Sequence, residues 1–122
     1  MKLFILIGIV NGFIAVALGA FGAHGLEGKV SEKALKTWEK AVSYQMFHTV
    51  ALLVTGLLLA KFHSGGMVWA GWMFFIGILL FSGSLYIYST TAIKTFAMIT
   101  PLGGVAFLIG WVILGTAVVK YL

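Results

Sequence analysis

Polar side chains placed within long apolar stretches are the residues of this sequence best able to do chemistry. They are Asn11, Gln45, His48, Thr49, Ser82 and Ser84. Because a polar group in hydrocarbon is costly without a partner, each should meet a hydrogen-bonding group or a ligand. Gln45 lies three residues before His48 and four before Thr49, so in a helix all three would point to one side. Trp38 would lie below them on the same face.

This polar face has two interpretations. In the functional one, His48 is the centre of a binding pocket or a proton-handling site, because the ordinary pKa of imidazole lies near neutrality. In the structural one, the polar groups bond between helices, with Asn11 and Ser84 among the partners, and set the register of the helices. Such bonds are worth ~1 kcal/mol each in membrane proteins, so they specify a packing more than they stabilise it.

The other chemically competent residues give weaker signals. His24 ends the first apolar run and could approach His48 at one membrane face, which would allow a shared ligand. We expect no metal site, because no Asp or Cys is nearby and Glu27, Glu32 and Glu39 lie in a polar connection. No carboxylate lies inside an apolar run, and no nucleophile elbow, P-loop or dinucleotide fingerprint is present. Neither enzymatic chemistry nor a cofactor is therefore expected.

The composition indicates whether these residues lie in water or in a membrane. The chain has 122 residues, of which 61% are hydrophobic and only 9% charged. Its mean hydropathy is +1.11. This excess of apolar surface predicts an all-α integral membrane protein with a single domain over residues 1–122. Four apolar runs, at about 3–23, 41–60, 67–88 and 101–119, predict an antiparallel bundle of four transmembrane helices. The first run is longer than the apolar part of a typical signal peptide, so it is expected to remain as a span.

Local signals refine the ends of these spans. Residues 31–40 form an amphipathic pattern that begins with Ser31 as N-cap, and predict a short interfacial helix that leads into the second span continuously or through a bend. Thr100 and Pro101 are expected as the N-cap and first residue of the fourth helix, where a missing N–H is harmless. Most Trp and Tyr residues, Tyr86 included, fall near span ends as an interfacial belt requires. Trp111 lies in the middle of a span, so its indole N–H needs a partner.

Glycines recur along the spans at helical spacing, and this pattern predicts close contacts between helices. The candidate packing positions are Gly8, Gly12, Gly19, Gly77, Gly103 and Gly110. Small residues let helix backbones approach in a membrane, where no hydrophobic effect drives association. These contacts are expected inside one bundle, with contacts between protomers of a homo-oligomer as the alternative.

The basic residues anchor the chain at the membrane surface. Eight lysines are spread over all connections and both termini, which does not form the basic face of a nucleic-acid-binding protein. With four spans both termini lie on one side together with Lys2, Lys61 and Lys120, and the other five lysines lie opposite. The positive-inside rule then predicts a cytoplasmic first connection and both termini outside.

Several unusual strings resemble a known family. Asn11-Gly12, the run from Gly19 to Leu26, Tyr44-Gln45 with His48, the run from Phe81 to Tyr86, and the run from Ile99 to Gly104 are similar to the YgdD/YwdK-like family of small bacterial membrane proteins. The resemblance covers nearly the whole chain. It implies a four-span fold in the bacterial cell membrane and relatives among mitochondrial membrane proteins, but no established reaction or catalytic residue.

These observations favour a non-enzymatic function. The leading hypothesis is a small membrane protein that binds a lipid or another lipophilic ligand, or stabilises a membrane assembly. A proton-coupled transporter or oligomeric channel component that uses His48 is the first alternative. A membrane enzyme acting on a lipophilic substrate is the second.

Overall fold

The computed structural model describes residues 2–122 and shows four long helices joined by short connections. Helix α1 (Lys2–Phe21) continues into a π-helical turn, η1 (Gly22–Leu26), and α2 (Glu32–Lys61) follows. The third rod consists of α3 (Gly65–Gly77), the π-helical turn η2 (Ile78–Ser82) and α4 (Gly83–Thr91), and the fourth is α5 (Lys94–Tyr121). Each of the four is long and apolar enough to cross a membrane. The predicted all-α, four-span architecture is confirmed.

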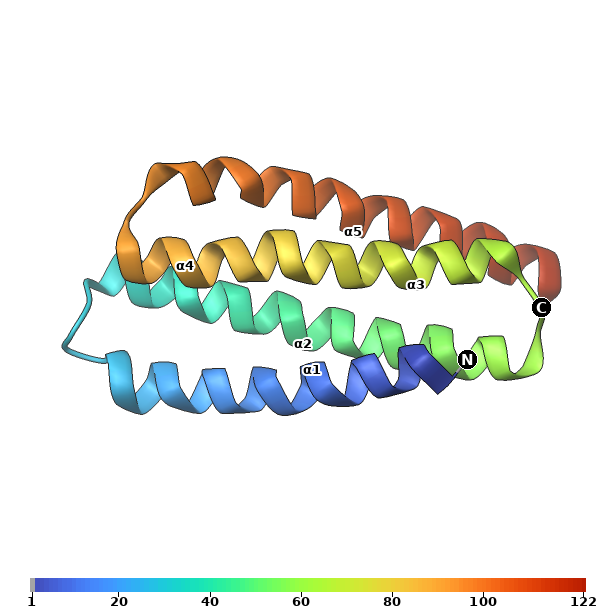
Figure 1. The fold of residues 1–122 in the computed structure, drawn as a ribbon, viewed down its shortest axis with the longest axis horizontal. Coiled ribbons are helices and arrows are strands. Elements are labelled where there is room, and N and C mark those ends of the chain that lie inside the picture. Colours follow the sequence, from blue (N-terminus) through green and yellow to red (C-terminus); the bar gives the residue numbers. More distant parts are fainter. Residues whose placement is uncertain (1) are drawn as a thin grey trace.

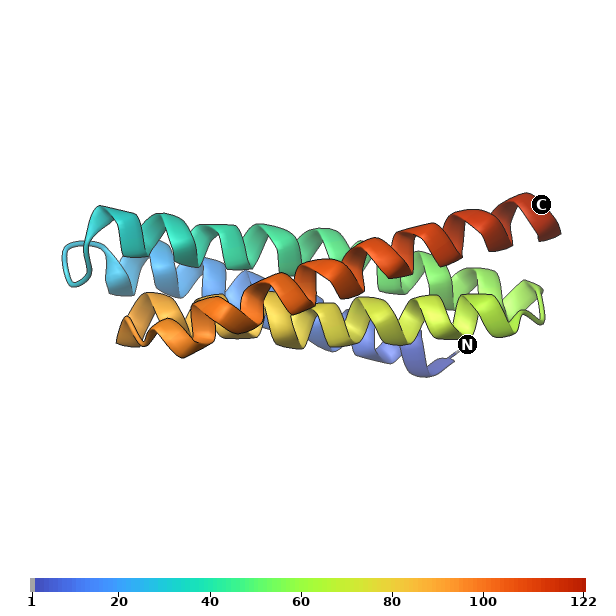
Figure 2. The ribbon, with the colours of Figure 1, turned by 90° about the horizontal axis from the view of Figure 1, so that it is seen from above.

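The four rods lie along one axis, and each runs antiparallel to the rod before it in the chain. Both chain termini lie at one end of the bundle, opposite the connection between α1 and α2 (Figure 1). The first rod packs along α2 and the third packs along α5, while α2 joins the two pairs through its contacts with α3, η2 and α4. Seen from above, α5 crosses the other helices obliquely (Figure 2). The backbones of α2 and α5 make few contacts with each other.

The amphipathic segment 31–40 forms the first turns of α2. The Ser31 hydroxyl accepts a hydrogen bond of 3.1 Å from the Ala34 N–H, as expected of an N-cap. No break separates this segment from the span, so of the two forms expected the continuous one is found and residues 2–122 contain no separate interfacial helix. Trp38 is buried against Gly22, and its indole N–H donates to the Leu18 carbonyl at 2.8 Å. The apolar side of this segment thus packs on the first rod.

The predicted start of the fourth helix at Thr100 and Pro101 is wrong. Helix α5 begins at Lys94 and contains Pro101 in its interior. A proline there removes one helical hydrogen bond, which membrane helices tolerate because neighbouring helices and hydroxyl side chains compensate. The Thr100 hydroxyl donates to the Phe96 carbonyl and lies 2.6 Å from the Ser84 hydroxyl of α4. Thr100 therefore ties α5 to α4 and caps nothing.

Glycines mark the places where the rods come closest. A Cβ on Gly103 would collide with the backbone of Phe81, and a Cβ on Gly77 would collide with the Phe107 ring. A Cβ would also collide with a side chain at Gly8 and Gly110, would be tight at Gly19, and would have ordinary van der Waals space at Gly12. Sequence reasoning missed two further positions, Gly22 and Gly71. These glycines pack inside the bundle, the first of the two arrangements expected.

Candidate functional site

A chain of hydrogen bonds links three rods through buried amides. The Tyr86 hydroxyl of α4 donates to the Gln45 side-chain oxygen of α2 at 2.6 Å. The Gln45 amide nitrogen donates to the Asn11 side-chain oxygen of α1 at 3.0 Å, and Asn11 donates to the Ile7 carbonyl at 2.9 Å. Gln45 and Asn11 are both buried. The sequence places Tyr86 in the interfacial belt, and it takes part in this network because it lies in the first half of α4 and its ring packs against Trp38.

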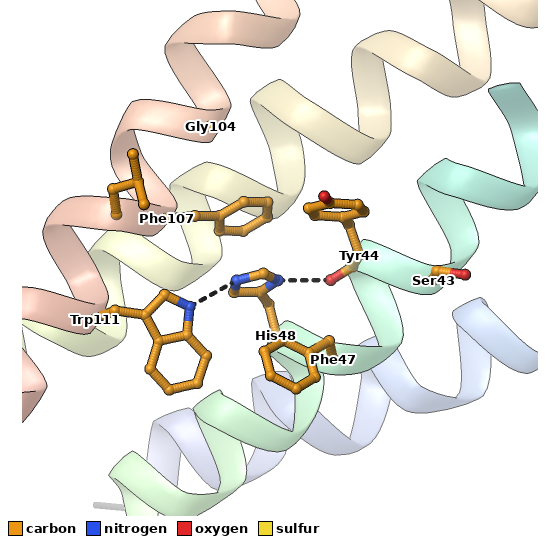
Figure 3. Close-up of a pocket in the computed structure, with 8 residues that line it drawn as sticks. Ser43, Tyr44, Phe47, His48, Gly104, Phe107 and Trp111 are labelled. Atoms are coloured by element: carbon orange, nitrogen blue, oxygen red, sulfur yellow. Dashed lines mark hydrogen bonds between the residues drawn. The ribbon is translucent and has the colours of Figure 1, made fainter.

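His48 points from α2 toward α5 and lies between these two helices (Figure 3). Its Nδ1 lies 2.7 Å from the Tyr44 carbonyl, and the Trp111 indole N–H donates to Nε2 at 3.0 Å. Since a carbonyl only accepts and an indole N–H only donates, His48 is the neutral tautomer with hydrogen on Nδ1. Its ring stacks on Phe107 with the centroids 3.5 Å apart. Trp111, which needed a partner in the middle of its span, finds it here.

Gln45 and His48 do not share one polar site. Residues three apart on a helix differ by about 60° in direction, and long side chains that start from neighbouring positions diverge from there. The Gln45 amide accordingly meets Asn11 and Tyr86, while the His48 imidazole meets Trp111. The two side chains start from neighbouring positions, as expected, and both are buried, but they meet different helices. The predicted polar cluster is therefore divided into two sites.

An open groove of about 550 Å³ lies beside His48, between α2 and α5. It is lined by Ser43, Tyr44, Phe47, His48, Gly104, Phe107, Leu108 and Trp111. Seven of these are labelled in Figure 3, where the rings of Phe47, Phe107 and Trp111 surround the imidazole. Phe47 is 62% exposed and Leu108 67% exposed, so the groove faces the surroundings of the bundle. Phe107 and Gly104 were not singled out from sequence, although both lie on the helical face of Trp111.

The remaining predicted polar residues are buried and serve the packing. The Ser82 hydroxyl of η2 donates to the Ala41 carbonyl of α2 at 2.8 Å. The Ser84 hydroxyl lies 2.9 Å from the Phe81 carbonyl and 2.6 Å from the Thr100 hydroxyl, and its single hydrogen is donated to one of them at a time. Thr49 is buried beside Gly12, and its hydroxyl has no hydrogen-bond partner within residues 2–122.

His24 is not part of either site. It lies exposed in η1, next to Gly22, which packs against Trp38. His48 follows Trp38 by about ten residues on the same helix, which is about 15 Å at the α-helical rise. The expected approach of His24 to His48 is therefore wrong. Within residues 2–122, no group of three His, Cys, Asp or Glu side chains is placed to hold a metal ion.

The arrangement around His48 suits contact with an apolar group better than proton transfer. Both nitrogens of His48 are engaged by protein groups, so the imidazole has no lone pair free to accept a proton from a substrate. No carboxylate or second histidine contacts it among the residues described. The rings around the groove offer a preformed apolar surface instead.

The fold and these sites define a class: a small multi-pass membrane protein with an interior of hydrogen bonds and aromatic packing. Residues 18–104 match the family described as "Protein of unknown function (DUF423)", and the chain belongs to that family. It is 53% identical over 123 residues to the UPF0382 membrane protein YwdK of Bacillus subtilis, with all of both chains covered. It is also 53% identical over 121 residues to the UPF0382 membrane protein SAB0533 of Staphylococcus aureus, covering 99% of this chain and 98% of that one.

The family and the membrane location expected from sequence are thereby confirmed. A third relative, the UPF0382 membrane protein SERP0230 of Staphylococcus epidermidis, is 51% identical over 121 residues and covers 99% of this chain and 98% of its own. No solved structure matches the chain.

Proposed function

We propose that the protein binds the hydrocarbon chain of a membrane lipid or similar lipophile in the groove between α2 and α5. The observation that carries the proposal is the groove itself, about 550 Å³ of open space walled by aromatic rings on the outer surface of a membrane bundle. In a bilayer such a surface is in contact with acyl chains, and a groove of this size is large enough for part of one.

The depth of the groove supports an apolar occupant. Helix α2 has 30 residues and His48 lies about 24 Å from its start at Glu32, which is near its midpoint. Trp111 occupies the corresponding level of α5, about 26 Å from its start at Lys94. Headgroups lie about 15 Å from the middle of a bilayer, so the groove is within reach of the chains alone.

The pairing of the polar atoms of His48 and Trp111 also supports a hydrocarbon. The indole N–H of Trp111 and both nitrogens of His48 bond within the protein. Ser43 points its hydroxyl away from the rings (Figure 3). An occupant therefore meets mainly ring faces and edges, which favour dispersion contacts over hydrogen bonds. Proton-coupled transport is supported less well, because His48 has no free nitrogen.

We also propose that the connection from Glu27 to Ser31 faces the cytoplasm. Lys29, Lys33, Lys36, Lys40 and Lys94 lie at that end of the bundle, opposite the two termini. The positive-inside rule places the more basic end in the cytoplasm. Both termini then lie outside.

Photo-crosslinking in liposomes tests the groove. The purified protein is reconstituted with a phospholipid whose acyl chain carries a diazirine near its middle, and labelled residues are mapped by mass spectrometry. Labelling of Phe47 and Leu108 is normalised to labelling of Phe13, which is 77% exposed on α1. Wild-type protein should show several-fold enrichment at the groove over Phe13.

Two glycine variants of the same helix provide the comparison. Gly104→Leu fills the groove, since a Cβ there would meet only the Phe81 ring, at 3.9 Å. Gly115→Leu adds the same side chain where a Cβ has nothing within 4 Å. Enrichment should disappear in the first variant and persist in the second. Equal labelling of Phe47, Leu108 and Phe13 in wild type would overturn the proposal.

A further inference from the structure

A second groove, of about 390 Å³, lies between the first and third rods. Its walls are largely apolar, but Asn11, Gln45 and Tyr86 of the buried network all line it. Ser82 and Gly83 line it as well, at the junction of η2 and α4. π-helical turns such as η2 are frequent at functional sites. The groove therefore combines buried amides with an irregular helix.

The two side-chain amides of this groove, Asn11 and Gln45, have N–H donors that are not used in hydrogen bonds within the described residues. A primary amide nitrogen carries two hydrogens. Gln45 uses one on the Asn11 oxygen, and Asn11 uses one on the Ile7 carbonyl. The hydrogen bonds formed within residues 2–122 thus leave a second hydrogen on each nitrogen. Gln45 is 4% exposed and Asn11 7% exposed, so these donors lie in a site where an unmatched N–H is unfavourable.

We infer that this groove binds a lipophilic molecule that carries a carbonyl group within its apolar body, and that the spare amide hydrogens of Asn11 and Gln45 donate to that carbonyl. A carbonyl oxygen has two lone pairs and no hydrogen, so it matches a pair of donors. This groove shares no lining residue with the acyl-chain groove, and the inference does not depend on it.

The depth of Asn11 in the membrane indicates which class of carbonyl compound can bind in this groove. Asn11 is the tenth of the 20 residues of α1, so it lies near the middle of that span. The ester carbonyls of glycerolipids stay near the interface, about 15 Å away. A carbonyl at mid-depth belongs to a molecule such as a long-chain ketone or an alkylated quinone. Both present the same acceptor to the amides, and separate probes distinguish them.

Infrared spectroscopy of a labelled carbonyl tests the inference. The full-length protein is reconstituted in liposomes with methyl 12-oxostearate labelled with carbon-13 at the ketone, and in a parallel sample with a labelled benzoquinone bearing a decyl tail. A carbonyl that accepts hydrogen bonds shifts its stretching band to lower frequency. At least one probe should show a shifted band that saturates with protein, and the probe that does so identifies the source of the carbonyl.

Two comparisons keep the test independent of folding and of the first groove. Methyl stearate, which has a methylene in place of the ketone, should compete roughly tenfold less well, the effect of losing one ordinary hydrogen bond. Gly83→Leu fills this groove, because a Cβ there would meet only the Ile78 carbonyl at 3.9 Å, and should remove the shifted band. Gly104→Leu, which fills the other groove, should leave it intact.

Three results would overturn the inference. The first is the absence of a protein-dependent shift for both probes, which means that water or nothing satisfies the amides. The second is equal competition by methyl stearate and the ketone. The third is a shifted band that persists in Gly83→Leu. None of these results bears on labelling of the groove between α2 and α5, so the two proposals can fail separately.

Discussion

The imidazole of His48 lies almost flat on the ring of Phe107, with centroids 3.5 Å apart and planes 11° from parallel. The Tyr44 carbonyl and the Trp111 indole hold the two ring nitrogens from opposite sides. With one face covered and both nitrogens bonded, the imidazole has a single orientation. His48 thus joins α2 to α5, between which the backbones do not come close.

Replacing Trp111 with Phe tests this connection. The change keeps an aromatic ring but removes the N–H, so Nε2 of the buried His48 loses its donor. The free energy of unfolding should fall by about 1–2 kcal/mol, because a buried acceptor is left unpaired and some ring area is lost. Denaturant titration of the protein in mild detergent micelles, followed by far-UV circular dichroism, measures the change.

Trp69→Phe is the matched control for this variant. Trp69 is 63% exposed on α3, so the same substitution should change the free energy of unfolding by less than about 0.5 kcal/mol. Equal losses in the two variants would show that the indole N–H of Trp111 contributes nothing specific.

Gly103→Ala should be strongly destabilising. The added methyl group would meet the backbone of Leu80 and Phe81, where no flexible side chain can move aside. Separating α5 from η2 should cost about 1–3 kcal/mol of the free energy of unfolding. Gly115→Ala in the same helix has open space and should be neutral or stabilising by up to about 1 kcal/mol, because alanine favours a helix. Thermal unfolding of the two variants in one detergent compares them, and the same sign for both would contradict the packing described.

The number of helices follows from the sequence because span length and apolarity are local properties. The four apolar runs all lie within the helices observed. The ends were harder to predict, since Thr100-Pro101 matches a helix start as well as it matches a tolerated interior proline. The two π-helical turns could not be predicted either, because no sequence pattern identifies them and their formation depends on packing against neighbouring helices.

The candidate site was predicted in its parts and not in its arrangement. Burial of Gln45 and His48 follows from their place in an apolar run, and both are buried. Which neighbour each one meets depends on the crossing of the rods, which the sequence of one helix does not contain. Trp111 could have been paired with His48 by matching their levels, because each lies about 16 residues into its helix and both helices run in the same direction.

Single-cysteine labelling tests the topology and the proposed orientation. The chain has no native cysteine, so each introduced thiol reports one position. Lys2→Cys and Leu122→Cys should react with a membrane-impermeant maleimide added to intact cells, whereas Gly28→Cys should react only after the membrane is permeabilised. Labelling of the termini from different sides would contradict the four-span fold. Labelling of Gly28→Cys alone in intact cells would keep the fold and reverse the orientation.

The bond between Asn11 and Gln45 should be measurable as a coupling energy. The single variants Asn11→Leu and Gln45→Leu each strand the other amide, while the double variant removes both ends of the 3.0 Å bond. The loss in the double variant should therefore be smaller than the sum of the single losses by about 1 kcal/mol, in the range found for hydrogen bonds between membrane helices. Gln45→Leu also strands the Tyr86 hydroxyl, so the cycle is repeated with Tyr86→Phe as the background. In that background the coupling between Asn11 and Gln45 should remain, because Tyr86 bonds the Gln45 oxygen and Asn11 accepts from its nitrogen. Strict additivity in both backgrounds would show that the two amides do not hold the rods in register.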